Sequence, residues 1–345
     1  MTEAPLRELV ATVAAGLDRG VVAGAAMRRK LGRRTPERLG PEARIEGLER
    51  LAEAWDRPAW RDGDAFFPVP AVNPRERPLP CPFPGAEAVE ITWQRDYDPV
   101  VKPIAGAYLG HRANLRFEAR WFRGTGRPRP TLLAIHGYGG GSPDWEQRIF
   151  PVRRLLASGL DVVLPVLPFH GSRAAGGVRF PGADPRWTLE GFRHAITDLR
   201  ALLALIRGRG APRLGAWGMS LGGYTASLLA TVEALDFLVP LIPLASLPDF
   251  ALEHGRLHGT PEQVRAQHEG LQRVYRAVSP LHRTPRVPGE QVLVLAGRAD
   301  RITGPTQAEH LAAHFGGRLV VFPGGHLLQI GMRGRLDEAI ALSLG

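Results

Sequence analysis

Leu214-Gly-Ala-Trp-Gly-Met-Ser-Leu-Gly-Gly223 is an apolar run, typical of a buried strand, that ends in a serine between glycines and leads into a helical segment from Ser220 to Glu233. A serine on such a strand-to-helix turn adopts a strained backbone, and bulky residues two positions away on either side would clash. Gly218 and Gly222 occupy those positions. The stretch therefore predicts a tight turn that exposes the Ser220 hydroxyl, beside a helix N-terminus that favours developing negative charge.

The rest of the chain places this turn in a larger sheet. Five further apolar runs suit strands that are buried on both faces, and helical segments such as Trp187–Arg207 lie between most of them. These runs cover 131–135, 161–167, 237–242, 291–295 and 318–322. The alternation predicts an α/β fold with a mostly parallel, doubly wound sheet. Residues 89–94 and 115–121 alternate apolar and polar side chains, which predicts an antiparallel pair at a sheet edge.

The chain divides into an N-terminal extension and a larger domain. Residues 1–60 show helical spacing of apolar residues, and the prolines between Pro68 and Pro84 exclude a helix or a central strand there. We therefore expect an N-terminal helical extension and Pro-rich linker at 1–86, followed by one domain at 87–345. Within it, about 245–288 has a helical pattern too long for a simple crossover, which predicts a small helical lid insertion. A structural excursion without functional meaning is the alternative.

Composition excludes several classes of protein. The 345 residues carry a formal net charge of +10, but of the 44 basic residues only Lys30 and Lys102 are lysines, and the other 42 are arginines spread along the chain. This distribution argues against a nucleic-acid partner. Cys81 is the single cysteine, so the chain forms no internal disulfide and no thiolate metal cluster. No apolar run approaches the roughly 20 residues that span a bilayer, so we expect no stable membrane insertion.

The N-terminus has none of the order of an export signal. Its apolar stretch is interrupted by Glu8, Asp18 and Arg19, and its basic cluster follows that stretch rather than preceding it. We therefore expect a cytoplasmic protein.

A serine hydroxyl needs a base to act as a nucleophile, and the base needs an acid to orient it. Asp300 and His326 each follow an apolar run, so both fall at carboxyl ends of strands, the edge where open α/β sheets place their sites. Their order after Ser220 is the order expected for this architecture. Asp249, which follows the preceding strand, is the alternative acid.

A second set of residues indicates an oxyanion hole. The run Leu133-Ala-Ile-His-Gly-Tyr-Gly-Gly-Gly141 is a buried strand that opens into a glycine-rich loop. Such a loop can bring the backbone N–H of Tyr138 to a carbonyl oxygen, and the N–H of Leu221 would be the second donor. His136, His170 and Met219 are candidates for lining the pocket or orienting this loop.

Four histidines of the predicted insertion have no spacing typical of a metal site, so no metal is expected. They are His254, His258, His268 and His282.

Together these motifs resemble those of the α/β-hydrolases, over roughly residues 87 to 343. The resemblance rests on His136-Gly-Tyr138, Gly218-x-Ser220-x-Gly222, Leu295-Ala-Gly-Arg-Ala-Asp300 and Gly325-His326, in the family's order. It implies the α/β-hydrolase fold and the chemistry of a serine esterase or lipase. It also implies a catalytic triad of Ser220, Asp300 and His326, with Tyr138 and Leu221 as oxyanion donors.

The sequence therefore predicts a serine hydrolase that cleaves a carboxylic ester, or a related acyl bond, through an acyl-enzyme. The partner is a small-molecule acyl substrate, and the mechanism requires neither a metal nor an organic cofactor. Three alternatives stay open: an acyltransferase with the same nucleophile, a catalytically silent binding protein with the hydrolase fold, and a lipase that acts at a membrane surface. The N-terminal helices either extend the core or mediate assembly into a homo-oligomer.

Overall fold

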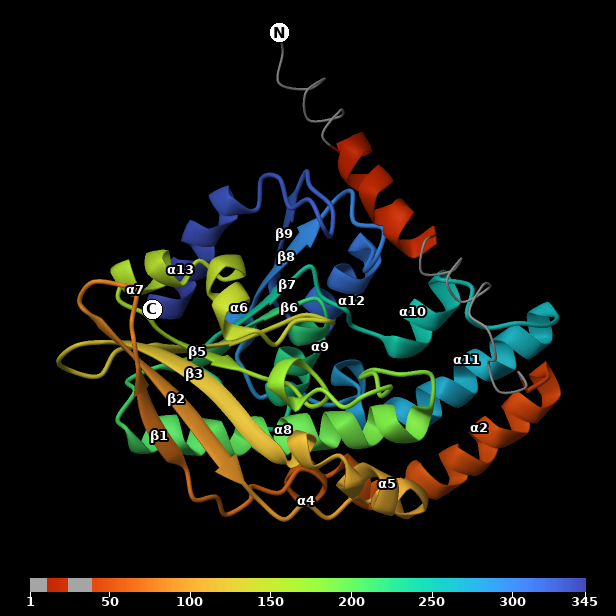
Figure 1. The fold of residues 1–345 in the computed structure, drawn as a ribbon. Helices are drawn as coiled ribbons and strands as arrows, with labels where there is room; N and C mark the ends of the chain where they lie inside the picture. Colours follow the sequence, from red (N-terminus) through yellow and green to blue (C-terminus); the bar gives the residue numbers. More distant parts are fainter. Residues whose placement is uncertain (1–10, 24–38) are drawn as a thin grey trace, which may run out of the picture.

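The computed structural model describes residues 11–23 and 39–345, which build one twisted sheet with helices on both faces (Figure 1). The sheet has nine strands in the order β1-β2-β3-β5-β4-β6-β7-β8-β9. Their bounds are β1 Arg75–Leu79, β2 Ala86–Gln94, β3 Arg116–Gly124, β4 Thr131–Ile135, β5 Asp161–Pro165, β6 Leu214–Met219, β7 Leu238–Leu241, β8 Leu293–Gly297 and β9 Arg318–Phe322. The six strands from β5 to β9 in this order run parallel, which confirms the predicted doubly wound sheet.

The apolar runs form the central strands because both of their faces are covered. Every residue of β4, β5 and β8 is buried. Leu133 and Ile135 of β4 pack into the core on one face, whereas Leu132 and Ala134 pack into the core on the other. The first face is covered by α8 Pro185–Gly208, α9 Leu221–Leu229 and α12 Pro305–Phe315, and the second by α7 Val152–Ala157 and α13 Leu336–Leu344. Figure 1 shows α8 running the length of the first face.

The antiparallel part of the sheet is larger than predicted. β2 and β3 form the expected pair, with Val89 opposite Trp121. β1 adds a further antiparallel strand outside them, in the segment that the sequence assigns to the linker. Pro78 lies within β1, which a sheet tolerates at its edge because the missing N–H leaves no central ladder bond unmade. The sheet therefore begins at Arg75 rather than after residue 86.

The insertion after β7 is helical, with α10 Leu247–Glu253 and α11 Pro261–Tyr275. The N-terminal helix α2, Pro41–Trp55, packs along α11 (Figure 1). Leu48 of α2 lies so close to Gly270 of α11 that a Cβ on the glycine would be 3.0 Å from the Leu48 Cβ. An ion pair of 3.0 Å joins Asp56 to Arg276. The N-terminal extension thus packs against the insertion.

Several short elements connect these parts. They are α3 Pro58–Arg61, α4 Gly63–Phe66, α5 Ala105–Gly110, α6 Pro143–Ile149 and the 3-10 turns Lys102–Ile104, Arg112–Leu115, Gly171–Arg173, Arg276–Val278, Pro280–His282, Gly289–Gln291 and Arg333–Arg335. Among the described residues, no helix is both long enough and apolar enough to cross a bilayer. The predictions that rest on Glu8 fall outside the described residues.

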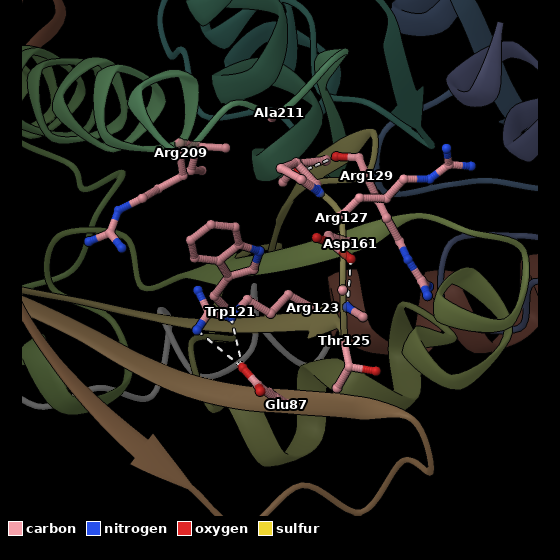
Figure 2. A pocket seen from close by; sticks show the side chains of 14 residues that line it. Glu87, Trp121, Arg123, Thr125, Arg127, Arg129, Asp161, Arg209 and Ala211 are labelled. Carbon is pink, nitrogen blue, oxygen red and sulfur yellow. Dashed lines mark hydrogen bonds and ion pairs between the residues drawn. The ribbon is translucent and has the colours of Figure 1, made fainter.

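A cavity of about 310 Å³ opens at the amino ends of the parallel strands (Figure 2). Thr131 and Asp161, the first residues of β4 and β5, line it together with Trp121. Arg123, which forms a 3.1 Å ion pair with Glu87, also lines it. Because Ser220 follows the carboxyl end of β6, this cavity lies at the opposite edge of the sheet.

Candidate active site

Ser220 occupies a one-residue turn between β6 and α9, with φ 56° and ψ −113°. A non-glycine residue rarely adopts this region, so the turn is held by its surroundings. The Ser220 N–H donates to the Leu241 carbonyl (2.9 Å), and the Ser220 carbonyl accepts from the Leu244 N–H (3.1 Å). The two bonds tie the serine to the end of β7, and its side chain remains at the partly exposed rim of the sheet.

The glycines beside Ser220 allow the turn because backbone approaches them closely. A Cβ on Gly222 would lie 1.9 Å from the Ile135 carbonyl oxygen. A Cβ on Gly218 would lie 2.1 Å from the Gly222 carbonyl oxygen. Both neighbours are backbone atoms, which cannot rotate away, so both positions require glycine, as the sequence predicts.

Asp300 and His326 come together on the loops after β8 and β9. The His326 Nδ1 lies 2.8 Å from the Asp300 Oδ2. Asp300 is buried, and its Oδ1 accepts from the backbone N–H groups of Ile302 and Thr303, both at 2.8 Å. These bonds fix the carboxylate so that Oδ2 faces the imidazole. The structure therefore brings the Asp300 and His326 side chains into contact.

Thr303 is a neighbour of this pair that the sequence analysis does not single out. Its Oγ1 lies 3.0 Å from the His326 Nδ1 and 2.9 Å from the Ile242 carbonyl oxygen. Ile242 follows β7, the same strand end that holds the Ser220 backbone. A threonine three residues after an aspartate is a turn pattern that could have indicated it.

Met219 also links the serine strand to the histidine loop. The Gln329 Nε2 donates to the Met219 Sδ (3.6 Å) and to the His326 carbonyl (3.0 Å). The residue directly before Ser220 thus contacts the loop that carries His326.

The glycine-rich loop after β4 lies directly against Ser220. A Cβ on Gly137 would lie 3.3 Å from the Met219 carbonyl oxygen and 3.5 Å from the Ser220 Cβ. Within residues 11–23 and 39–345, no acceptor is bonded to the backbone N–H of Tyr138 or of Leu221. Two unpaired N–H groups beside a serine suit a developing oxyanion.

His136 holds this loop through hydrogen bonds at both ring nitrogens. Its Nε2 accepts from the Leu167 N–H (3.1 Å), so the proton lies on Nδ1, which donates to the Gly137 carbonyl (2.8 Å). Burial, with a smaller contribution from His170, lowers the pKa of His136 to about 3. A neutral imidazole bonded at both nitrogens is a support rather than a base.

His170 lies beside the same loop. Its ring centroid is 5.0 Å from that of His136 and 6.0 Å from that of Tyr138. Its Nδ1 is engaged by the Pro168 carbonyl (2.9 Å), and burial lowers its pKa. Both candidate histidines, His136 and His170, therefore lie beside this loop.

Asp249, the alternative acid, is engaged elsewhere. Its Oδ1 lies 2.6 Å from the Nε2 of His268 in the insertion. His254, another histidine of the insertion, contacts the Ile302 carbonyl through Nε2 (2.8 Å). No group of three or more His, Cys, Asp or Glu in the described part of the chain is arranged to hold a metal ion.

Comparison with known proteins bears on the family and the fold. The model of the Alpha/beta hydrolase family matches residues 132–338. An uncharacterized protein of Mycobacterium tuberculosis, from strains CDC 1551 / Oshkosh and H37Rv, is 36% identical over 234 residues. That match covers 65% of this chain and 56% of the relative, so the chain spans about half the length of the relative.

Solved structures share the fold at low sequence identity. Acetyl Xylan Esterase 1 from Thermoanaerobacterium sp. JW/SL YS485 is 18% identical with a TM-score of 0.63, covering 86% of this chain and 98% of the esterase. The acetyl xylan esterase from Paenibacillus sp. R4 is 14% identical with a TM-score of 0.60, covering 85% and 98%. With a family model that matches more than half of its length, a parallel sheet and a strained serine turn in the expected place, the chain belongs to the alpha/beta hydrolase family.

Proposed function

We propose that this protein is a serine hydrolase that cleaves a carboxylic ester through an acyl-enzyme on Ser220. One observation carries the proposal: Ser220 is held at φ 56° on the turn, and the His326–Asp300 pair lies on neighbouring strand ends. A purely structural role does not require a serine with a strained backbone at this turn. A nucleophile requires it, because the strained turn exposes the hydroxyl.

The first half of the reaction forms the acyl-enzyme. Ser220 Oγ attacks the ester carbonyl carbon while His326 Nε2 takes its proton, because Nδ1 is engaged by Asp300. The Asp300 carboxylate stabilises the resulting imidazolium. The negative charge on the carbonyl oxygen is bound by the N–H groups of Tyr138 and Leu221, each worth about 3 kcal/mol.

Collapse of this tetrahedral intermediate completes the acyl-enzyme. Protonated His326 gives its proton to the leaving alcohol oxygen as the carbon–oxygen bond of the ester breaks. In the second half of the reaction, water attacks the acyl carbon while His326 takes a proton from it. His326 then gives that proton to Ser220 Oγ as the acyl–Oγ bond breaks, which releases the acid and regenerates Ser220. The side chains of this chain and one water supply every proton transfer.

A small acyl ester is the first substrate to test. The two solved structures named above are acetyl xylan esterases and share the fold over almost their whole length. Their names motivate acetyl esters as the starting panel, extended to longer acyl chains and to thioesters.

The direct test is intact mass spectrometry after treatment with a fluorophosphonate, beside the variant Ser220→Ala. A single adduct on the wild type that the variant lacks would establish an activated Ser220. A folded wild type that forms no adduct would contradict the proposal and favour a silent binding protein. An excess of alcohol or thiol added to the ester assay tests the acyltransferase alternative, which requires capture of the acyl group faster than by water.

A further inference from the structure

The N-terminal helical segment lies against the two loops that carry the acid and the base. Residues 11–23 are helical, and Figure 1 shows them (red) beside the blue C-terminal segments near α12. Ala14 and Ala15 are buried against Ala299. Leu328 and Ala11 pack onto the same small cluster. This segment precedes the part of the chain that the family model covers.

Asp18 is the polar centre of this contact and has no exposed surface. Its Oδ2 accepts from the backbone N–H groups of His326 (2.8 Å) and Arg301 (3.1 Å). Its Oδ1 accepts from the Leu327 N–H (3.0 Å). One carboxylate thus binds both loops: it bonds to His326 itself and to Leu327 on one loop, and to Arg301, the residue after Asp300, on the other.

The loop is shaped to receive this carboxylate. A Cβ on Gly325 would lie 2.7 Å from the Asp18 Oδ2, so a glycine at this position lets the carboxylate approach. Hydrogen bonds from neutral N–H groups to an ionised carboxylate are stronger than neutral ones, and three of them offset much of the cost of burying the charge. Without Asp18, the three backbone N–H groups of Arg301, His326 and Leu327 would lose this acceptor.

We infer that Asp18 is a positioning residue, which holds the His326 and Asp300 loops in the arrangement that makes His326 an effective base. This inference rests on the proposed function. A displacement of catalytic groups by about 1 Å can cost roughly 100-fold in rate, so loops held by three bonds to one side chain are sensitive to its loss. The hydrogen bonds of Asp18 go to the loops of Asp300 and His326 and not to Ser220 or the glycine-rich loop after β4, so substrate binding is expected to survive.

The test compares Asp18→Ala and Asp18→Asn with Arg19→Ala, a change at an exposed position of the same helix. The full-length chain is assayed with an acetyl ester, and backbone amide exchange is followed by mass spectrometry. Asp18→Ala is expected to lower kcat about 100-fold with KM within about twofold, and to speed exchange at Arg301, His326 and Leu327. Asp18→Asn keeps the size but turns an NH₂ toward at least one donor, so its kcat is expected to be intermediate. Arg19→Ala is expected to match the wild type.

Each other result overturns the inference. Unchanged kcat with faster exchange would mean that Asp18 only docks the helix. Lower kcat with unchanged exchange would mean that Asp18 does not act through the loops. The fluorophosphonate separates this inference from the proposed function: an unlabelled wild type overturns both, whereas equal labelling rates of wild type and Asp18→Ala overturn the positioning role alone.

Discussion

Replacing Asp300 by Asn tests the assignment of the acid with little change in shape. In the wild type, the Asp300 Oδ1 accepts two backbone N–H bonds, from Ile302 and Thr303. An asparagine keeps its oxygen at that position because an NH₂ there would face two donors. Its NH₂ therefore replaces Oδ2, which faces His326 Nδ1 at 2.8 Å.

The NH₂ of the asparagine and the Nδ1–H of His326 are both donors and cannot bond to each other. The imidazole must therefore move its proton to Nε2 or rotate. In either case Nε2 no longer accepts the proton of Ser220. The wrong tautomer in a Ser-His-Asp site lowers kcat by about 10⁴, which corresponds to about 5.5 kcal/mol of transition-state stabilisation. The fold itself is expected to persist, because the two backbone bonds to the side-chain oxygen remain.

The assay measures initial rates with p-nitrophenyl acetate, and thermal unfolding is recorded for each variant. Asp249→Asn is the matched control, since Asp249 pairs with His268 rather than with His326. It is expected to retain kcat within about twofold. An Asp300→Asn variant within tenfold of the wild type, or a large loss in Asp249→Asn instead, would refute this reading of the geometry.

Two further predictions concern the stability of the folded state. Gly222→Ala puts a methyl 1.9 Å from the Ile135 carbonyl oxygen and is expected to lower the free energy of unfolding, measured in urea, by about 3 kcal/mol or more. Gly47→Ala has open space on the helix α2 and is expected to raise that free energy by about 0.5–1 kcal/mol, so equal effects of the two changes would contradict the packing argument. Burial raises the pKa of Asp161 from 3.8 to about 6, so its contribution to stability is lost as the pH rises through 6. The free energy of unfolding of Asp161→Asn, relative to that of the wild type, is therefore expected to rise by up to about 2 kcal/mol between pH 4 and pH 8. A difference between the two proteins that does not change with pH would contradict this prediction.

Local patterns in the sequence were sufficient for the central fold. The apolar runs predict β4 and β5 because burial on both faces requires apolar side chains at every position. The glycines around Ser220 predict the turn because the clash they avoid is set within five residues of chain. The long helix α8, Pro185–Gly208, follows from its periodicity in the same way.

Patterns at the edge of the fold were less informative. The prolines before residue 86 correctly exclude a central strand, but an edge strand tolerates Pro78, and β1 pairs there with β2. Pairing depends on the partner strand, which the local sequence does not contain.

The sequence by itself determined the fold class, the serine turn and the set of candidate site residues. Only the tertiary structure decided that Asp300 rather than Asp249 faces His326, and that His136 is bonded at both nitrogens. It also decided the place of Asp18, whose bond to His326 spans 308 positions. The physical reason is that periodicity and turn chemistry act between near neighbours in the chain, whereas the partner of a buried carboxylate is set by which loops the packed core brings together.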